Sequence, residues 1–163
     1  MRVAIAFVAA YLYLGIVVLE GLYLLLSFRN RWEKLLSAAL FIGLTAFVIS
    51  LAANRTIEDP RPFVVSGVAP LIPSSTDNGF PSDHTLLVAA AAAVILTVSP
   101  GMGVLGMLAA FAIGMARVYA GVHHVADVLG SLAIAAAAFG LYEGLIRLWN
   151  LRKRRTERRR PRG

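Results

Sequence analysis

Five apolar stretches, separated by short polar segments, divide the chain. They cover approximately residues 3–28, 35–53, 84–98, 102–119 and 128–149. A helix that crosses a bilayer needs about 20 apolar residues, within a usual range of about 17 to 25. Four stretches meet that length, and the short third one holds an alanine run (89–93) that is typical of close helix packing. We therefore predict an all-α, polytopic membrane helix bundle with about five transmembrane spans.

The composition supports a lipid environment. Hydrophobic residues make up 58% of the 163 residues and charged residues 15%, whereas a soluble domain is roughly half apolar and about a quarter charged. The chain has no cysteine, which excludes disulfide frameworks, cysteine-based zinc sites and thiol nucleophiles. We expect one membrane-embedded domain over residues 1–150 and a separate tail over residues 151–163.

Positive charge is concentrated in two segments. The net charge is +7, and eight of the 16 Lys and Arg residues lie within residues 152–162. Three more, Arg29, Arg31 and Lys34, lie between the first two apolar stretches. Because cytoplasmic segments of membrane proteins are enriched in Lys and Arg, both segments are predicted to be cytoplasmic. The tail is predicted to be disordered and to lie beside the lipids of the plasma membrane rather than to bind nucleic acid.

Two other connections, residues 54–83 and 120–127, are then predicted to face outward, whereas the turn at residues 99–101 is predicted to be cytoplasmic. Three polar segments lie in or beside them, at the ends of the apolar stretches: residues 59–63, 80–84 and 116–127. Placing an ionisable group within the membrane costs free energy, so such residues are candidates for a functional site. These segments are therefore the candidate chemistry of the chain.

The second segment has the pattern of a helix start. Pro81 and Ser82 precede an apolar run, with Ser82 in the position of a cap. The first turn of a helix offers free backbone N–H groups and the positive end of the helix dipole, which together bind anions. His84 would lie in that turn, beside the anion. The alternative is an ordinary cap followed by a surface histidine.

In the third segment, His123 and Asp127 are four residues apart. If the helix begins at Val122, both side chains lie on one face, one turn apart. The carboxylate can then accept from one imidazole nitrogen, fix the tautomer and leave the other nitrogen free as a nucleophile. A purely structural His–Asp hydrogen bond is the alternative.

Two arginines complete the set. Arg61 lies between Pro60 and Pro62, which restrict the backbone around it, and its planar guanidinium suits phosphate oxygens. Arg117 lies near the outer end of the fourth apolar stretch. Taken alone, the first is an ordinary loop arginine and the second an interfacial residue whose head group reaches water.

On one membrane face, these groups are the parts of a phosphoryl-transfer site that needs no metal and no cofactor. One histidine attacks phosphorus, while arginines and backbone amides stabilise the oxygens on which charge builds. The other histidine donates a proton to the leaving oxygen and then activates water. We interpret the chain as a metal-independent phosphatase.

The three segments, in this order, resemble the signature motifs of the type-2 phosphatidic acid phosphatase superfamily. The resemblance covers roughly residues 54–127. It implies that His123 is the nucleophile and forms a phosphohistidine, that Asp127 orients it, and that His84 is the general acid and base. It also implies that phosphate is bound by Arg61, Arg117 and the Ser82 region.

The sequence departs from the family pattern at several positions. The first motif begins with a lysine in the family, where this chain has Asn54 followed by Arg55; Arg55 is a candidate to replace the lysine. Asp83 and Ala116 stand where glycine and serine are usual. The Phe-Pro-Ser-Asp-His segment resembles undecaprenyl-pyrophosphate phosphatases of the bacitracin-resistance type. The resemblance therefore implies a polyprenyl pyrophosphate as substrate, and a core that usually has six spans where five are counted here.

Two other functions remain open. One is hydrolysis of phosphatidylglycerophosphate or phosphatidic acid, because the same fold serves these substrates in the superfamily. The other, from a different class, is an inactive membrane protein that binds lipid phosphates, and Asn54 in place of lysine is its motivation. His124 is interpreted as a rim residue, and Asp59 is given no role.

Overall fold

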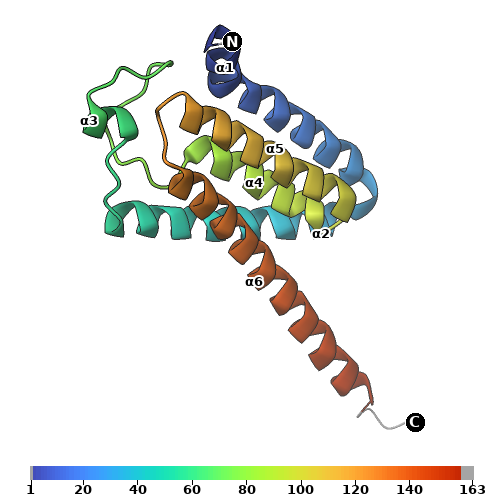
Figure 1. Ribbon diagram of the computed structural model, residues 1–163. Coiled ribbons are helices and arrows are strands. Elements are labelled where there is room, and N and C mark those ends of the chain that lie inside the picture. Colours follow the sequence, from blue (N-terminus) through green and yellow to red (C-terminus); the bar gives the residue numbers. More distant parts are fainter. Residues whose placement is uncertain (1, 159–163) are drawn as a thin grey trace.

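The structure, a computed structural model, describes residues 2–158 and is built from helices. In chain order the elements are α1 (Arg2–Phe7), the π-helical turn η1 (Val8–Leu12), α2 (Tyr13–Thr56), α3 (Pro62–Ser66), α4 (Asp83–Leu96), α5 (Pro100–Tyr119) and α6 (Val125–Arg158). Figure 1 shows α4 and α5 lying side by side between the arms of α2, with α6 beginning beside them and crossing in front of the second arm of α2. The predicted all-α fold is confirmed.

Within residues 2–158, four helical segments are long and apolar enough to cross a membrane. They are Arg2–Ser27, Arg31–Thr56, Pro100–Tyr119 and Val125–Thr156. The third predicted stretch is α4, a shorter apolar helix of 14 residues. At a rise of about 1.5 Å per residue it is about 21 Å long, which is less than the thickness of a hydrocarbon core.

The short helix α4 forms the centre of the bundle, since it packs against α2, α5 and α6. Its buried residues include Val88, Ala89, Ala92 and Ala93, each with no exposed surface. Small side chains let the neighbouring helix backbones approach closely. The alanine run therefore packs inside the bundle, as the sequence predicts.

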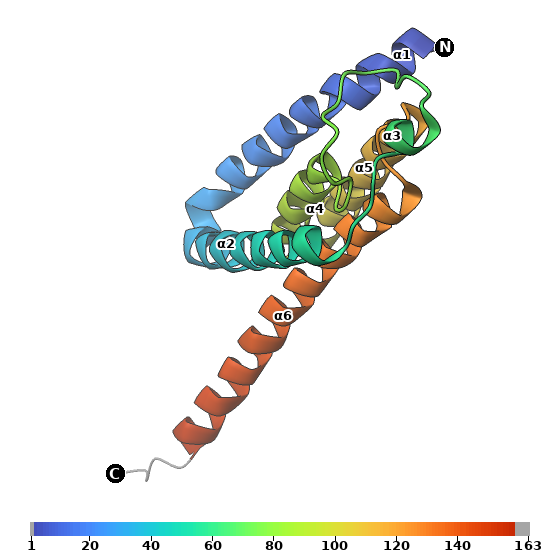
Figure 2. The same ribbon diagram turned by 90° about the vertical axis from the view of Figure 1, so that its left-hand side faces the viewer.

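The first two spans are joined by a sharp kink in α2 rather than by a loop. The helix is broken only at Arg31 (φ −142°, ψ 25°), and the chain reverses there (Figure 2). Just after the kink, Lys34 Nζ donates to the carbonyl of Thr97, and Arg31 Nη1 donates to the carbonyl of Val98 at 2.8 Å. Both carbonyls follow the end of α4, so two cations stabilise the negative end of that helix.

The long connection between α2 and α4 is folded over one end of the bundle (Figure 2). It contains the single-turn helix α3, which sequence analysis did not predict, and an isolated bridge between Pro60 and Asn78. The Asn78 side chain accepts from the backbone of Asp59 at 2.8 Å and donates to the carbonyls of Asn54 and Ile57. These bonds satisfy backbone groups that regular structure leaves free.

Helix α6 continues beyond the bundle to Arg158 (Figure 1). Residues 151–158 are therefore helical where a disordered tail was predicted, and the prediction for residues 159–163 lies outside the described residues. Lys and Arg are good helix formers, and a helix that is already nucleated extends at little cost. The basic composition of the tail therefore did not reveal that these residues continue the helix.

Candidate active site

His123 is positioned by the turn between α5 and α6. Gly121 adopts a left-handed conformation (φ 79°), which glycine adopts without a steric penalty, and the chain turns back over the bundle. His123 is buried there, with 3% of its surface exposed. Helix α6 begins at Val125, so the condition that the helix begins at Val122 is not met and His123 lies before the helix.

The predicted pair between His123 and Asp127 nevertheless forms, through a helix cap. Asp127 is the third residue of α6, and its Oδ2 accepts from the backbone N–H of His124 at 2.9 Å. A side chain at that position commonly reaches back to the N–H that precedes the helix. The same Oδ2 lies 3.1 Å from His123 Nδ1. Because a carboxylate accepts a hydrogen bond, Nδ1 carries the proton and Nε2 has a free lone pair.

Arg61 lies on the Nε2 side of the His123 ring. Its Nη1 is 3.5 Å from Nε2 and donates to the carbonyl of Val122 at 3.1 Å. Arg61 is buried, with 7% of its surface exposed. The first and third predicted segments are thus brought together around one imidazole.

Asp77 holds the other edge of the Arg61 guanidinium and was missed by sequence analysis. Its Oδ1 accepts from Arg61 Nη2 at 2.8 Å and from Nε at 3.0 Å. A hydrogen bond from the Ser75 hydroxyl, together with the charge of Arg61, holds the pKa of the Asp77 carboxyl below its usual value. Nothing in the sequence marks an aspartate within a long polar loop as the partner of a distant arginine.

Ser82 precedes the first turn of α4, as predicted, but its side chain makes no capping bond. The Ser82 side chain is fully buried, and its Oγ accepts from Thr85 Oγ1 at 3.1 Å. Ser131 of α6 donates to the Ser82 carbonyl at 3.1 Å. Ser82 therefore fixes the start of α4 to α6, and the first turn of α4 has the free N–H groups of any helix start.

His84 and Arg117 lie at the same end of the bundle. The His84 ring packs edge-on against Tyr13, with ring centroids 4.2 Å apart. His84 is within electrostatic range of Arg117, His123 and Arg61. The structure thus brings both predicted histidines and both arginines together. Tyr13 was not predicted, because it lies in an apolar span with no polar neighbour in sequence.

The π-helical turn η1 supports Arg117. Arg117 Nη1 donates to the carbonyl of Ala9 at 3.0 Å, and both residues are buried. In a π-turn the i→i+5 pattern alters the regular i→i+4 ladder and often marks a functional site. One edge of the guanidinium is thereby held, while its Nε has no hydrogen-bond partner within residues 2–158.

Arg55 and Asn54 take different roles. Asn54 Nδ2 donates to the carbonyl of Phe80 at 2.8 Å, so the residue at the lysine position connects the first segment to the second. Arg55 is exposed and lines an open cleft of ≈ 370 Å³ together with Glu58, Asp59 and Asp77. Within residues 2–158 no hydrogen bond joins Arg55 to the histidines, so its predicted phosphate contact stays a prediction.

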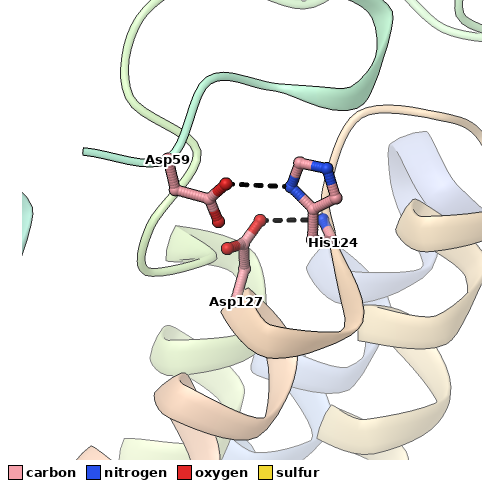
Figure 3. A group of neighbouring side chains, drawn as sticks. All are labelled: Asp59, His124 and Asp127. Carbon is pink, nitrogen blue, oxygen red and sulfur yellow. Dashed lines mark hydrogen bonds and ion pairs between the residues drawn. The ribbon is translucent and has the colours of Figure 1, made fainter. Parts of the chain in front are cut away.

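Asp59 and His124 lie beside the His123–Asp127 pair (Figure 3). His124 Nδ1 is 3.1 Å from Asp59 Oδ1, and the carboxyl of Asp59 faces that of Asp127. The nearby carboxyl of Asp127, with which Asp59 can share a proton, together with partial burial, raises the pKa of Asp59 to about 6. His124 is 40% exposed in its side chain, which agrees with a place on the rim.

The pattern of the PAP2 superfamily matches residues 34–150, which is more than half of the 163 residues. The chain belongs to the PAP2 superfamily. The resemblance inferred from the three segments is therefore confirmed.

Two similar proteins carry the name undecaprenyl-diphosphatase. Undecaprenyl-diphosphatase BcrC of Bacillus subtilis is 36% identical over 93 residues, which are 57% of this chain and 48% of the relative. An undecaprenyl-diphosphatase of Sulfolobus acidocaldarius is 34% identical over 108 residues, which are 65% and 52% of the two chains. The chain thus spans about half the length of these relatives.

The fold is also similar to that of a solved superfamily member. The crystal structure of a transmembrane PAP2-type phosphatidylglycerolphosphate phosphatase from Bacillus subtilis matches with a TM-score of 0.60 and 26% identity. The match covers 90% of this chain and 75% of that one. The helical arrangement is therefore that of transmembrane PAP2 proteins.

Proposed function

We propose that this chain is a membrane lipid phosphatase that hydrolyses a polyprenyl diphosphate, such as undecaprenyl diphosphate, to the monophosphate. One observation carries the proposal. His123 is buried with Nδ1 3.1 Å from Asp127 Oδ2 and Nε2 3.5 Å from Arg61 Nη1. A neutral imidazole whose free lone pair faces a buried guanidinium is suited to attack a phosphorus atom that the guanidinium binds.

The proposed reaction has two steps. In the first, His123 Nε2 attacks the terminal phosphorus, the bridging P–O bond breaks, and His84 donates a proton to the departing lipid monophosphate. In the second, His84 takes a proton from water, the water oxygen attacks the phosphohistidine, and inorganic phosphate leaves with Nε2 restored. Asp127 stabilises the positive ring between the two steps.

Phosphate binding is assigned to groups at the same end of the bundle as His123. Arg61, Arg117 and the first-turn N–H groups of α4 after Ser82 supply positive charge for the equatorial oxygens. No metal or cofactor takes part in these steps. Arg55, at the mouth of the open cleft, is assigned to the second phosphate of the substrate.

The site is proposed to face the outer side of the plasma membrane, with the C-terminus in the cytoplasm. The concentration of Lys and Arg at the opposite end of the chain's spans supports this orientation. Substrate would then enter from the outer leaflet, with its chain remaining among the membrane lipids.

The names of two relatives support a polyprenyl diphosphate as the substrate, since both are called undecaprenyl-diphosphatases. Phosphatidylglycerophosphate or phosphatidic acid is the second candidate, because the fold also matches a phosphatidylglycerolphosphate phosphatase. The alternative of an inactive lipid-phosphate-binding protein is motivated by Asn54, whose side chain bonds a backbone carbonyl.

A phosphate-release panel tests the proposal. Purified protein in detergent would be given undecaprenyl diphosphate, phosphatidylglycerophosphate and phosphatidic acid in separate reactions. We expect the largest kcat/KM with the diphosphate and a loss of roughly 10³-fold or more for His123→Ala, as for other removed nucleophiles. His124→Ala is the matched control, because it removes a neighbouring histidine that does not face Arg61.

The panel separates the three functions. Faster release from phosphatidic acid or phosphatidylglycerophosphate than from the diphosphate would overturn the substrate assignment but keep the site. If no lipid releases phosphate and His123→Ala changes nothing, the chain is a binding protein and the mechanism is wrong.

A further inference from the structure

Three side chains of the kinds that bind metal ions lie together on the Nδ1 side of the His123 ring. The group consists of Asp59, from the segment that follows α2, and of His124 and Asp127, from the start of α6 (Figure 3). One donor atom from each residue lies within 4.8 Å of the other two. The group contains one imidazole and two carboxylates, and the proposed phosphoryl-transfer steps use only Asp127.

An unsatisfied buried oxygen points into this group. Asp127 has no exposed surface, and its Oδ2 already accepts from the backbone of His124 and faces His123 Nδ1. Its Oδ1 is buried and has no hydrogen-bond partner within residues 2–158. Buried polar atoms are nearly always paired, and an unpaired one requires an explanation such as a bound ion. The facing carboxylate of Asp59 can satisfy Oδ1 only if a proton or a cation lies between them.

The group is also held rigidly. The backbone N–H of His124 fixes the Asp127 carboxylate at 2.9 Å. Gly79 donates its N–H to the Asp59 carbonyl at 2.8 Å, and a Cβ there would lie 3.0 Å from that carbonyl and 3.3 Å from Asp127 Oδ2. The glycine therefore lets the loop close tightly over both acids. Such outer contacts orient the ligands of metal sites.

The donor set indicates the class of cation. Mg²⁺ and Ca²⁺ prefer oxygen ligands alone, whereas an imidazole with carboxylates suits Zn²⁺ and related transition metals. The Asp59 and His124 side chains are 23% and 40% exposed, so an ion can enter from solvent and keep water in its remaining positions.

We propose that Asp59, His124 and Asp127 form a binding site for a divalent transition-metal cation of the Zn²⁺ class. The ion would connect the segment after α2 to the start of α6, and it would use the oxygen of Asp127 that does not face His123. The site shares Asp127 with the phosphatase assignment, so its test uses only Asp59 and His124, which have no role in that mechanism.

Calorimetric titration of the full, tag-free chain with ZnCl₂, after treatment with chelator, tests the site. We expect one Zn²⁺ per chain and an affinity that falls at least about tenfold in Asp59→Asn and in His124→Gln, because each loses a ligand. Glu58→Gln is the matched control: it removes the same charge from the adjacent, exposed acid and is expected to bind as the wild type does.

Thermal unfolding gives a second readout. A ligand that binds only the folded state raises the midpoint of unfolding, so Zn²⁺ should raise it in wild type and Glu58→Gln but not in Asp59→Asn/His124→Gln. Equal binding by all variants, or no binding by wild type at micromolar Zn²⁺, would overturn the proposal and leave a shared proton between the acids.

If the variants do not fold, the wild type alone decides the matter. The zinc X-ray absorption spectrum should show a single imidazole nitrogen with oxygen ligands. A spectrum with oxygen ligands only, or with several imidazoles, would place the metal elsewhere and contradict this site.

Discussion

At the scale of single residues, the His123 ring is held from both of its nitrogen sides. Asp127 faces Nδ1 and Arg61 faces Nε2. A guanidinium has only donors, so the nitrogen beside it must be an acceptor. The two contacts together select one tautomer. The lone pair therefore points to the place where Arg61 would hold a phosphate.

Replacing Asp127 by Asn tests this arrangement. We expect kcat to fall by about 10²-fold or more, because an amide can select the wrong tautomer and cannot stabilise a positive ring. KM for the lipid diphosphate should change little, because Asp127 lies on the far side of the ring from the phosphate. Steady-state phosphate release measures both constants.

The control for this variant is Glu58→Gln, which makes the same chemical change at an exposed acid outside the pair. Its kcat should equal that of wild type. A kcat for Asp127→Asn above half the wild-type value would show that Asp127 does not orient the nucleophile.

The sequence could predict the residues of this pair but not how they meet. Four-residue spacing indicated one face of a helix, whereas the contact forms because Asp127 caps the helix that begins at Val125. No sequence pattern indicated the ion pair between Asp77 and Arg61. It joins two positions of a long loop, and its geometry depends on tertiary folding rather than on periodicity.

At the scale of helices, glycines of α5 allow its close contact with α4. A Cβ at Gly103 would lie 2.5 Å from Leu96 Cγ, and one at Gly106 would lie 2.7 Å from Ala92 Cβ and 2.5 Å from Glu20 Oε1. The alanine run predicted that α4 is tightly packed. The sequence did not show that the glycines of α5 pack against α4. A hydrophobic pattern indicates which face of a helix is buried, but it does not indicate which helix packs against that face.

Gly106→Ala is predicted to destabilise the protein. The added methyl group would press on Ala92 of α4 and on the buried Glu20, and overpacking of this kind costs about 1 to 3 kcal/mol. Gly140→Ala is the control, because a Cβ there meets nothing within 4 Å. Thermal unfolding in the same detergent should show a lower midpoint for Gly106→Ala only, and equal midpoints for both variants would contradict the proposed packing.

At the scale of the whole molecule, the polar chemistry and the basic charge lie at opposite ends. The segment over the candidate active site covers the ends of α4, α5 and α6, whereas the far end of α6 extends away from the bundle (Figures 1 and 2). The kink after the first span carries Arg31 and Lys34, which stabilise the other end of α4. The sequence predicted this separation from the positions of its Lys and Arg residues. The number and order of the apolar stretches determine which connections lie at the same end of the bundle.

The lack of cysteine allows a direct test of orientation. Ser66→Cys places a thiol at the exposed end of α3, and Thr156→Cys places one in the exposed extension of α6. If the site faces outward and the basic end faces the cytoplasm, as we propose, a membrane-impermeant maleimide should label the first and not the second in intact cells. After permeabilisation both should be labelled, which controls for reactivity. Labelling of Thr156→Cys alone in intact cells would reverse the orientation and place the phosphate-binding residues on the cytoplasmic side.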